Sequence, residues 1–214
     1  TEFADWSQML GILAVVSLLV GNLAAIMQTN IKRLFAYSTV SHMGFILLAF
    51  MAGKLGFSAA LYYAIAYVVM GLVGFGVLML LSDETHECEN ISDLAGLNQR
   101  NAWYAFLMLL TMFSMAGIPP LMGFYAKFAV IKELLGAGYV WLSVFAVVMS
   151  LIGAFYYLRV VKVMYFDPAE NEQEVQGCMG SKVVLSFNAF LLLLWGVMPQ
   201  SVMDWCQKAL EYTL

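Results

Sequence analysis

Six apolar stretches, each about as long as a bilayer-spanning helix, dominate this sequence. They cover residues 6–27, 34–52, 57–81, 102–131, 139–166 and 183–203. A membrane-spanning helix needs about 20 mostly apolar residues. The stretches are continuous rather than alternating, and they exceed the roughly 10 residues of a transmembrane strand. The sequence therefore predicts an all-α integral membrane protein with six transmembrane helices, packed as a single bundle over residues 1–214.

The composition excludes most soluble classes of protein. Hydrophobic residues make up 63% of the chain and charged residues 11%, against about 25% charged residues in a soluble domain. The net charge of -4 leaves no basic surface for nucleic acid. None of the three cysteines forms a C-x-x-C pair, and we see no metal-ligand cluster, so neither a metal nor a redox cofactor is expected in this chain. The charged residues inside the membrane thus become the candidates for function.

The lysines and arginines predict an orientation. One side of the predicted bundle carries Lys32, Arg33, Arg100, Arg159, Lys162 and Lys182, and the other carries Lys54, Lys132 and Lys208. Cytoplasmic loops are the richer in Lys and Arg, so the first side is expected in the cytoplasm and both ends outside, in the periplasm of a bacterium. The terminal cations of the fifth stretch, Arg159 and Lys162, are expected to snorkel to the interface. Because the chain begins at Thr1, we expect a processed chain or a piece of a longer one.

A polar face in the second stretch is the first candidate site. Ser38, Ser41 and His42 are spaced at i, i+3 and i+4, so they share one face of a helix. His42 lies about 15 Å along the helix from Lys32, which is near the middle of the membrane. A histidine there can be a structural group bonded between packed helices. It can also relay protons, because an unperturbed imidazole titrates near pH 6.5.

Lys127 is the second candidate, since apolar residues flank it on both sides. One interpretation is that its side chain snorkels to an interface near Lys132, about 8 Å further along the helix. The other is a buried amine that exchanges a proton near neutral pH, which an arginine could not do. No acidic residue is evident near mid-membrane, so its counter-charge is expected on missing chain or on another subunit.

A predicted helix break lies between the two halves of the fourth stretch. Gly117, Pro119 and Pro120 interrupt an apolar run of about 45 Å, longer than a bilayer is thick. Prolines donate no backbone hydrogen bond, and broken backbone at membrane depth is tolerated only where protein or water satisfies it. Interrupted helices mark ion paths in transporters. The alternative is a packing kink without a role in transport.

These motifs together resemble a known family. Residues 28–34 and 36–44 read QTNIKRL and AYSTVSHMG, and AGIP at 116–119 is followed by Gly123-Phe124 and Lys127. This pattern is similar to that of the antiporter-like membrane subunits of respiratory complex I, the proton-pumping NADH:quinone oxidoreductase. The resemblance spans all six stretches and implies the C-terminal part of a 14-helix antiporter-like fold. Residues 28–33, 156–160 and 199–200 fit one bacterial subunit of this family best.

The resemblance also implies roles. Lys127 would be the terminal protonatable lysine on the broken helix, and His42 would link to it along the polar axis of the membrane. The chain would be a multi-pass inner-membrane subunit of this enzyme and would carry out no redox chemistry itself. Its partners would be lipid, other membrane subunits and the missing N-terminal half of the subunit. Flavin, iron–sulfur clusters and quinone would bind elsewhere. A sodium/proton antiporter subunit and a purely structural subunit remain the alternatives.

Overall fold

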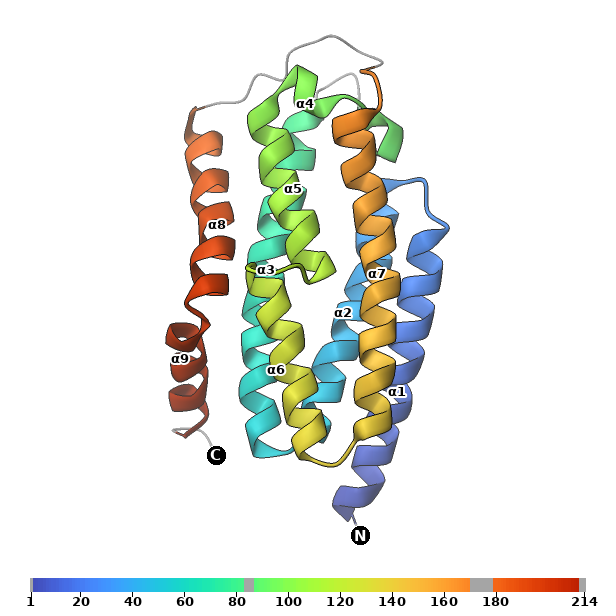
Figure 1. The fold of residues 1–214 in the computed structure, drawn as a ribbon, viewed down its shortest axis with the longest axis vertical. Coiled ribbons are helices and arrows are strands. Elements are labelled where there is room, and N and C mark those ends of the chain that lie inside the picture. The colour runs from blue at the N-terminus through green and yellow to red at the C-terminus, as the bar shows by residue number, and fades with distance from the viewer. Residues whose placement is uncertain (1, 83–86, 170–178, 212–214) are drawn as a thin grey trace.

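The protein is a bundle of long helices, as Figure 1 shows. The computed structural model describes residues 2–82, 87–169 and 179–211. Within these ranges the elements are α1 (Glu2–Ile26), α2 (Ile31–Met51), α3 (Lys54–Leu81), η1 (Ile91–Leu94), α4 (Leu97–Arg100), α5 (Ala102–Ala116), α6 (Met122–Gly136), α7 (Val140–Phe166), α8 (Met179–Val197) and α9 (Pro199–Glu211). The prediction of an all-α fold is confirmed.

Five of the described helices are long and apolar enough to cross a membrane: α1, α2, α3, α7 and α8. The fourth predicted stretch is instead divided between α5 and α6, which have 15 residues each. A helix of that length reaches about 22 Å, short of the roughly 30 Å hydrocarbon core. The predicted break is therefore confirmed, and the two half-helices share the path of one span.

The sixth predicted span was wrong in its extent. It was expected to run from 183 to 203, but α8 ends at Val197 and a separate helix, α9, begins at Pro199. Pro199 has no N–H and cannot continue the hydrogen-bond ladder of α8. The residues beyond it form an amphipathic helix that buries Val202, Met203 and Cys206 and leaves the Trp205 side chain exposed.

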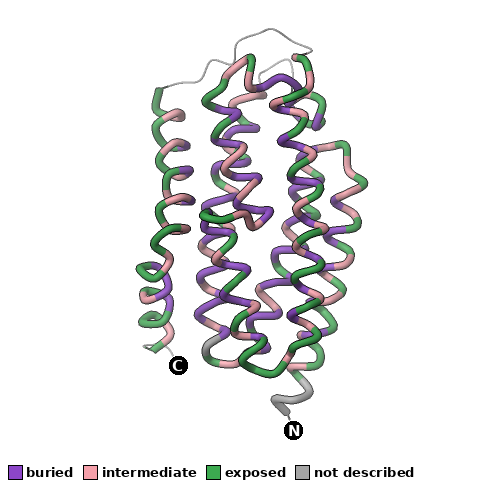
Figure 2. Tube along the Cα trace, viewed as in Figure 1, coloured by how far each residue is buried: buried purple, intermediate pink, exposed green. Residues whose placement is uncertain are grey.

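Burial follows the expected pattern for a membrane bundle. Figure 2 shows buried residues along the faces that the helices turn toward one another. The outer faces carry exposed large apolar side chains, among them Val16, Leu151, Phe155 and Phe187. Such faces suit lipid or further membrane-embedded protein.

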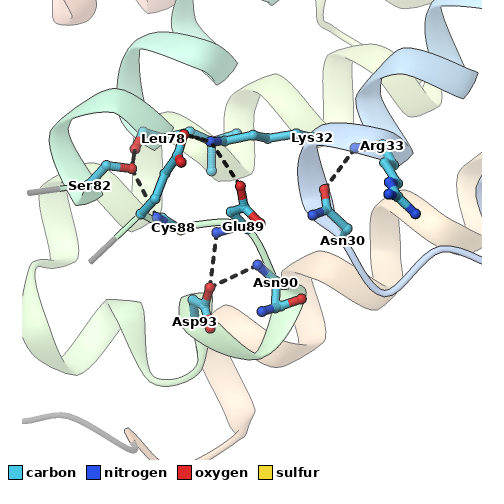
Figure 3. A network of polar contacts seen from close by, with 10 residues as sticks. Asn30, Lys32, Arg33, Leu78, Ser82, Cys88, Glu89, Asn90 and Asp93 are labelled. Carbon is cyan, nitrogen blue, oxygen red and sulfur yellow. Dashed lines mark hydrogen bonds and ion pairs between the residues drawn. The ribbon is translucent and has the colours of Figure 1, made fainter. Parts of the chain in front are cut away.

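A polar network ties the connection after α3 to the start of α2 (Figure 3). The Lys32 amine pairs with the carboxylates of Glu87 and Glu89, and Asn30 forms an antiparallel bridge with Asn90. Cys88 belongs to this network through its N–H, which donates to the Ser82 hydroxyl, and burial raises the pKa of its thiol to about 11. Cys88 and Cys206 are free thiols, whereas Cys178 falls outside the described residues.

Arg159 reaches the C-terminal end of α1. Its guanidinium donates to the carbonyl oxygens of Ile26 at 2.9 Å and of Gln28 at 2.5 Å. These carbonyls close the C-terminal end of α1, where unpaired carbonyls and the helix dipole favour a cation. Arg159 therefore binds α7 to α1. Lys162 behaves differently, since it is largely exposed and pairs with Asp167 at 3.0 Å.

Candidate functional site

The break between α5 and α6 is built by contacts between the two half-helices. Gly117 ends α5 in the left-handed conformation, with φ 87° and ψ 41°, and its N–H bonds back to the last turn of α5. The Pro119–Pro120 peptide is cis. Leu121, the residue that precedes α6, makes no side-chain hydrogen bond to the first turn of the helix. Instead, Ser114 of α5 accepts a hydrogen bond from the Gly123 N–H at 3.1 Å.

Lys127 reaches back across this break. Its Nζ donates to the carbonyl oxygens of Met115 at 2.9 Å and Ala116 at 3.0 Å, and to the hydroxyl of Ser150 on α7 at 3.0 Å. It also lies 5.5 Å from the centre of the Phe45 ring. Only 7% of the residue is exposed. The snorkelling interpretation of Lys127 was therefore wrong, because the amine points into the bundle.

Within the described residues, the Lys127 amine meets the carbonyls of α5, and a counter-charge on missing chain or on another subunit stays a prediction. Among the residues the structure describes, Lys127 forms no ion pair with a carboxylate. Its amine instead meets the C-terminal end of α5, where the freed carbonyls and the helix dipole carry partial negative charge. The same contact satisfies the carbonyls that the break exposes at membrane depth, as broken backbone there requires.

Gly117 leaves room for this lysine. A Cβ at Gly117 would lie 3.0 Å from Cδ of Lys127 and 3.4 Å from its Nζ. The left-handed backbone at this position also favours glycine. Gly117 therefore serves both the end of α5 and the course of the Lys127 side chain.

His42 lies in a second polar cluster, made with two tyrosines. Its Nδ1 is 2.7 Å from the Tyr63 hydroxyl, and its Nε2 is 3.0 Å from the Tyr157 hydroxyl. A neutral imidazole donates at one nitrogen and accepts at the other, so one tyrosine donates to His42 and the other accepts from it. The three side chains come from α2, α3 and α7 and are each no more than 3% exposed.

The two predicted serines have different surroundings. Ser41 accepts a hydrogen bond from the Asn22 amide of α1 at 2.9 Å, and Asn22 in turn accepts from the Tyr156 hydroxyl at 3.2 Å. Ser38 is fully buried, but its hydroxyl donates to the Phe35 carbonyl of its own helix at 2.8 Å. Ser41 thus bonds to α1, while the Ser38 hydroxyl bonds its own backbone and also contacts the Tyr157 hydroxyl of the His42 cluster.

A small cavity lies between these two groups. It measures about 10 Å³, and its lining includes Asn22, Ser41, His42, Lys127 and Ser150. That volume is close to the space needed for one water molecule, and the lining offers several polar partners. His42 and Lys127, which stand 85 positions apart in the sequence, therefore face the same water-sized space.

Sequence reasoning missed several members of the site: Asn22, Tyr63, Ser114, Ser150 and Tyr157. Asn22 had a usable signal, since it is an amide in the middle of an apolar stretch. The others had none, because their partners lie on other helices. In the described part of the chain, no three His, Cys, Asp or Glu side chains gather in a way that could hold a metal ion.

Comparison with known proteins places the chain in a family. Residues 2–153 match the family model described as NADH:quinone oxidoreductase/Mrp antiporter, TM. The chain belongs to this antiporter-like family. The resemblance predicted from residues 28–44 and 116–127 is thus confirmed.

Curated relatives refine the resemblance to one subunit. The chain is 73% identical over 215 residues to NADH-quinone oxidoreductase subunit N of Neisseria gonorrhoeae, covering all of this chain and 45% of the relative. It is 55% identical to subunit N of Nitrosomonas europaea, over 98% of this chain and 44% of the relative. These likenesses agree with the motif at 28–33, which fits subunit N best among the antiporter-like subunits. The chain spans less than half the length of these relatives.

Solved structures share the antiporter-like fold. A chain of respiratory complex I from Thermus thermophilus superposes with a TM-score of 0.83 at 31% identity, over 92% of this chain and 45% of that one. A chain of the Mrp complex from Dietzia gives a TM-score of 0.82 at 20% identity, over 95% and 46%. The second likeness concerns the fold alone. The prediction of an antiporter-like helical fold is confirmed.

Proposed function

We propose that this chain forms part of a proton-translocating membrane subunit of an NADH:quinone oxidoreductase. It would hold the terminal half of a proton path, driven by NADH oxidation and quinone reduction elsewhere in the complex. One observation carries the proposal: the buried Lys127 amine, held at a broken helix, shares a water-sized cavity with His42.

The partners of Lys127 suit both of its protonation states. An ammonium group has three N–H donors and no acceptor, and these match the carbonyls of Met115 and Ala116 and the Ser150 oxygen. A neutral amine has two N–H donors and one lone pair. It can keep both carbonyls and accept from Ser150, because a hydroxyl both donates and accepts. The site therefore needs only a rotation of the Ser150 hydroxyl when the proton leaves.

The His42 cluster supplies the other half of the transfer. A neutral imidazole can accept a proton at one nitrogen and release one from the other, and the Tyr63 and Tyr157 hydroxyls can act as donor or acceptor on either side. One water in the shared cavity would complete the link toward Lys127. In this scheme a proton passes from the His42 cluster to Lys127, and Lys127 releases it toward the end of α6.

The distribution of charge supports an orientation in the bacterial inner membrane. Figure 1 shows the C-terminal ends of α1, α3 and α7 at one end of the bundle, whereas α1 begins and α9 ends at the other. The first end carries the larger number of Lys and Arg residues, a pattern typical of the cytoplasmic side. The first and last described residues would then be periplasmic, as would the C-terminal end of α6.

We also propose that the bundle functions with further membrane subunits, with the remainder of a longer subunit and with surrounding lipid. The exposed apolar faces of α1 and α8 support such contacts. NADH oxidation, with its flavin and iron–sulfur clusters, and quinone reduction would reside in other subunits.

A lysine substitution in the whole complex tests this function. Lys127→Met keeps a long apolar stem but carries no proton, so we expect fewer protons pumped per NADH oxidised in membrane vesicles. Lys132→Met is the matched control, since the Lys132 side chain is 68% exposed and pairs with its neighbour Glu133. An unchanged proton yield in Lys127→Met would remove this residue from the path, and sodium-driven exchange without quinone reduction would favour an antiporter instead.

A further inference from the structure

A second helix interruption lies where α8 meets α9. Pro199 cannot donate to the carbonyl of Trp195, four residues earlier, so that carbonyl loses its helical partner. The Tyr62 hydroxyl of α3 replaces it, donating to the Trp195 oxygen at 2.9 Å. Tyr62 has no exposed surface. The interruption is thus satisfied by a specific side chain from another helix, as membrane-embedded backbone requires.

This second interruption rests directly on the first one. A Cβ built at Gly196 would lie 2.1 Å from the carbonyl oxygen of Pro120 and 2.6 Å from the backbone of Leu121 and Met122. Figure 1 shows the α8–α9 junction near the level of the α5–α6 junction. Backbone therefore packs on backbone, and any side chain at position 196 would push the two interruptions apart.

This close approach is specific to one glycine of α8. A Cβ at Gly180, near the start of the same helix, would meet nothing within 4 Å. The close contact at Gly196 is therefore not a general property of α8. Its contact falls on the segment that starts α6, five residues before Lys127.

We propose that Gly196 and Tyr62 are positioning residues that brace the α5–α6 break. Pro120 and Met122 fix where α6 begins, and α6 carries the Lys127 amine to the carbonyls that end α5. A displacement at position 196 would move α6 relative to α5 and lengthen those hydrogen bonds. The brace rests on the proposed role of Lys127 in proton transfer, but its geometry can be measured without pumping.

Amide hydrogen exchange in the assembled complex provides that measurement. We expect the amides of residues 117, 118 and 121–124 to exchange about five-fold faster in Tyr62→Phe, which loses one hydrogen bond, and faster still in Gly196→Ala. Gly180→Ala is the control for the glycine. Tyr125→Phe is the control for the hydroxyl, because its ring packs against Tyr62 at 5.2 Å between centroids and no hydrogen bond of its hydroxyl is found in the described residues. Both controls should exchange like the unmodified complex.

The protons pumped per electron are then measured across the neutral pH range in the same variants. We expect a lower yield and a displaced pH profile in Tyr62→Phe and Gly196→Ala, with both controls unchanged. Unchanged exchange in both variants would overturn the brace. Faster exchange with an unaltered yield and pH profile would overturn its positioning role, provided that Lys127→Met lowers the yield. If Lys127→Met has no effect, the proposed function itself fails, whatever the exchange shows.

Discussion

Gly117→Ala should disturb the Lys127 site in two separable ways. The backbone at Gly117 has φ 87°, and an L-residue in the left-handed region costs about 1–2 kcal/mol. The new Cβ would also stand 3.0 Å from Cδ of Lys127, so the amine must shift. Losing one charged hydrogen bond to the α5 carbonyls adds about 1.5–3 kcal/mol. The expected total is about 2.5–5 kcal/mol of lost stability at the break.

Gly138→Ala separates these two effects. Gly138 has φ 86°, but a Cβ there meets nothing within 4 Å. Both variants should lower the denaturation midpoint of the purified complex, with the larger decrease in Gly117→Ala. Only Gly117→Ala should also reduce the protons pumped per NADH oxidised in vesicles. Equal proton yields in the two variants would refute the idea that Gly117 makes room for the lysine.

Three further perturbations test other parts of the account. Ser150→Ala should lower the proton yield without loss of assembled complex, because a neutral Lys127 loses its donor, and Ser150→Thr should restore the yield. Tyr157→Phe leaves Nε2 of His42 without its partner, at a cost of about 1–3 kcal/mol, and should slow pumping relative to electron transfer. Since burial raises the pKa of Cys88 to about 11, little of this thiol is ionised at pH 8. Iodoacetamide should therefore label Cys88 slowly at pH 8 and faster as the pH approaches 11, whereas rapid labelling in the folded complex would contradict its burial.

Features that depend on local sequence were predictable. Apolar length located the spans, and the prolines after Gly117 located the break, because a missing N–H interrupts a helix wherever it occurs. The end of α8 was missed although Pro199 carried the same signal. The predicted span was extended past that proline and the polar Gln200 and Ser201 to Met203, so the change to an amphipathic helix was missed.

Contacts between helices were not predictable from one sequence. Tyr157 lies 115 positions from His42, and Ser150 lies 23 positions from Lys127. Which faces meet depends on the packing of α2, α3, α6 and α7. The contacts of Lys127 within this chain are backbone carbonyls, which every residue carries and no pattern reveals.

A Lys127→Arg variant tests most directly whether this residue works as a proton carrier or only as a structural cation. Arginine keeps the positive charge and N–H donors for the α5 carbonyls, but it does not deprotonate in proteins. The measurement is the number of protons pumped per NADH oxidised by vesicles that contain wild-type amounts of assembled complex. We expect a yield as low as that of Lys127→Met. A wild-type yield with arginine at this position would contradict this expectation.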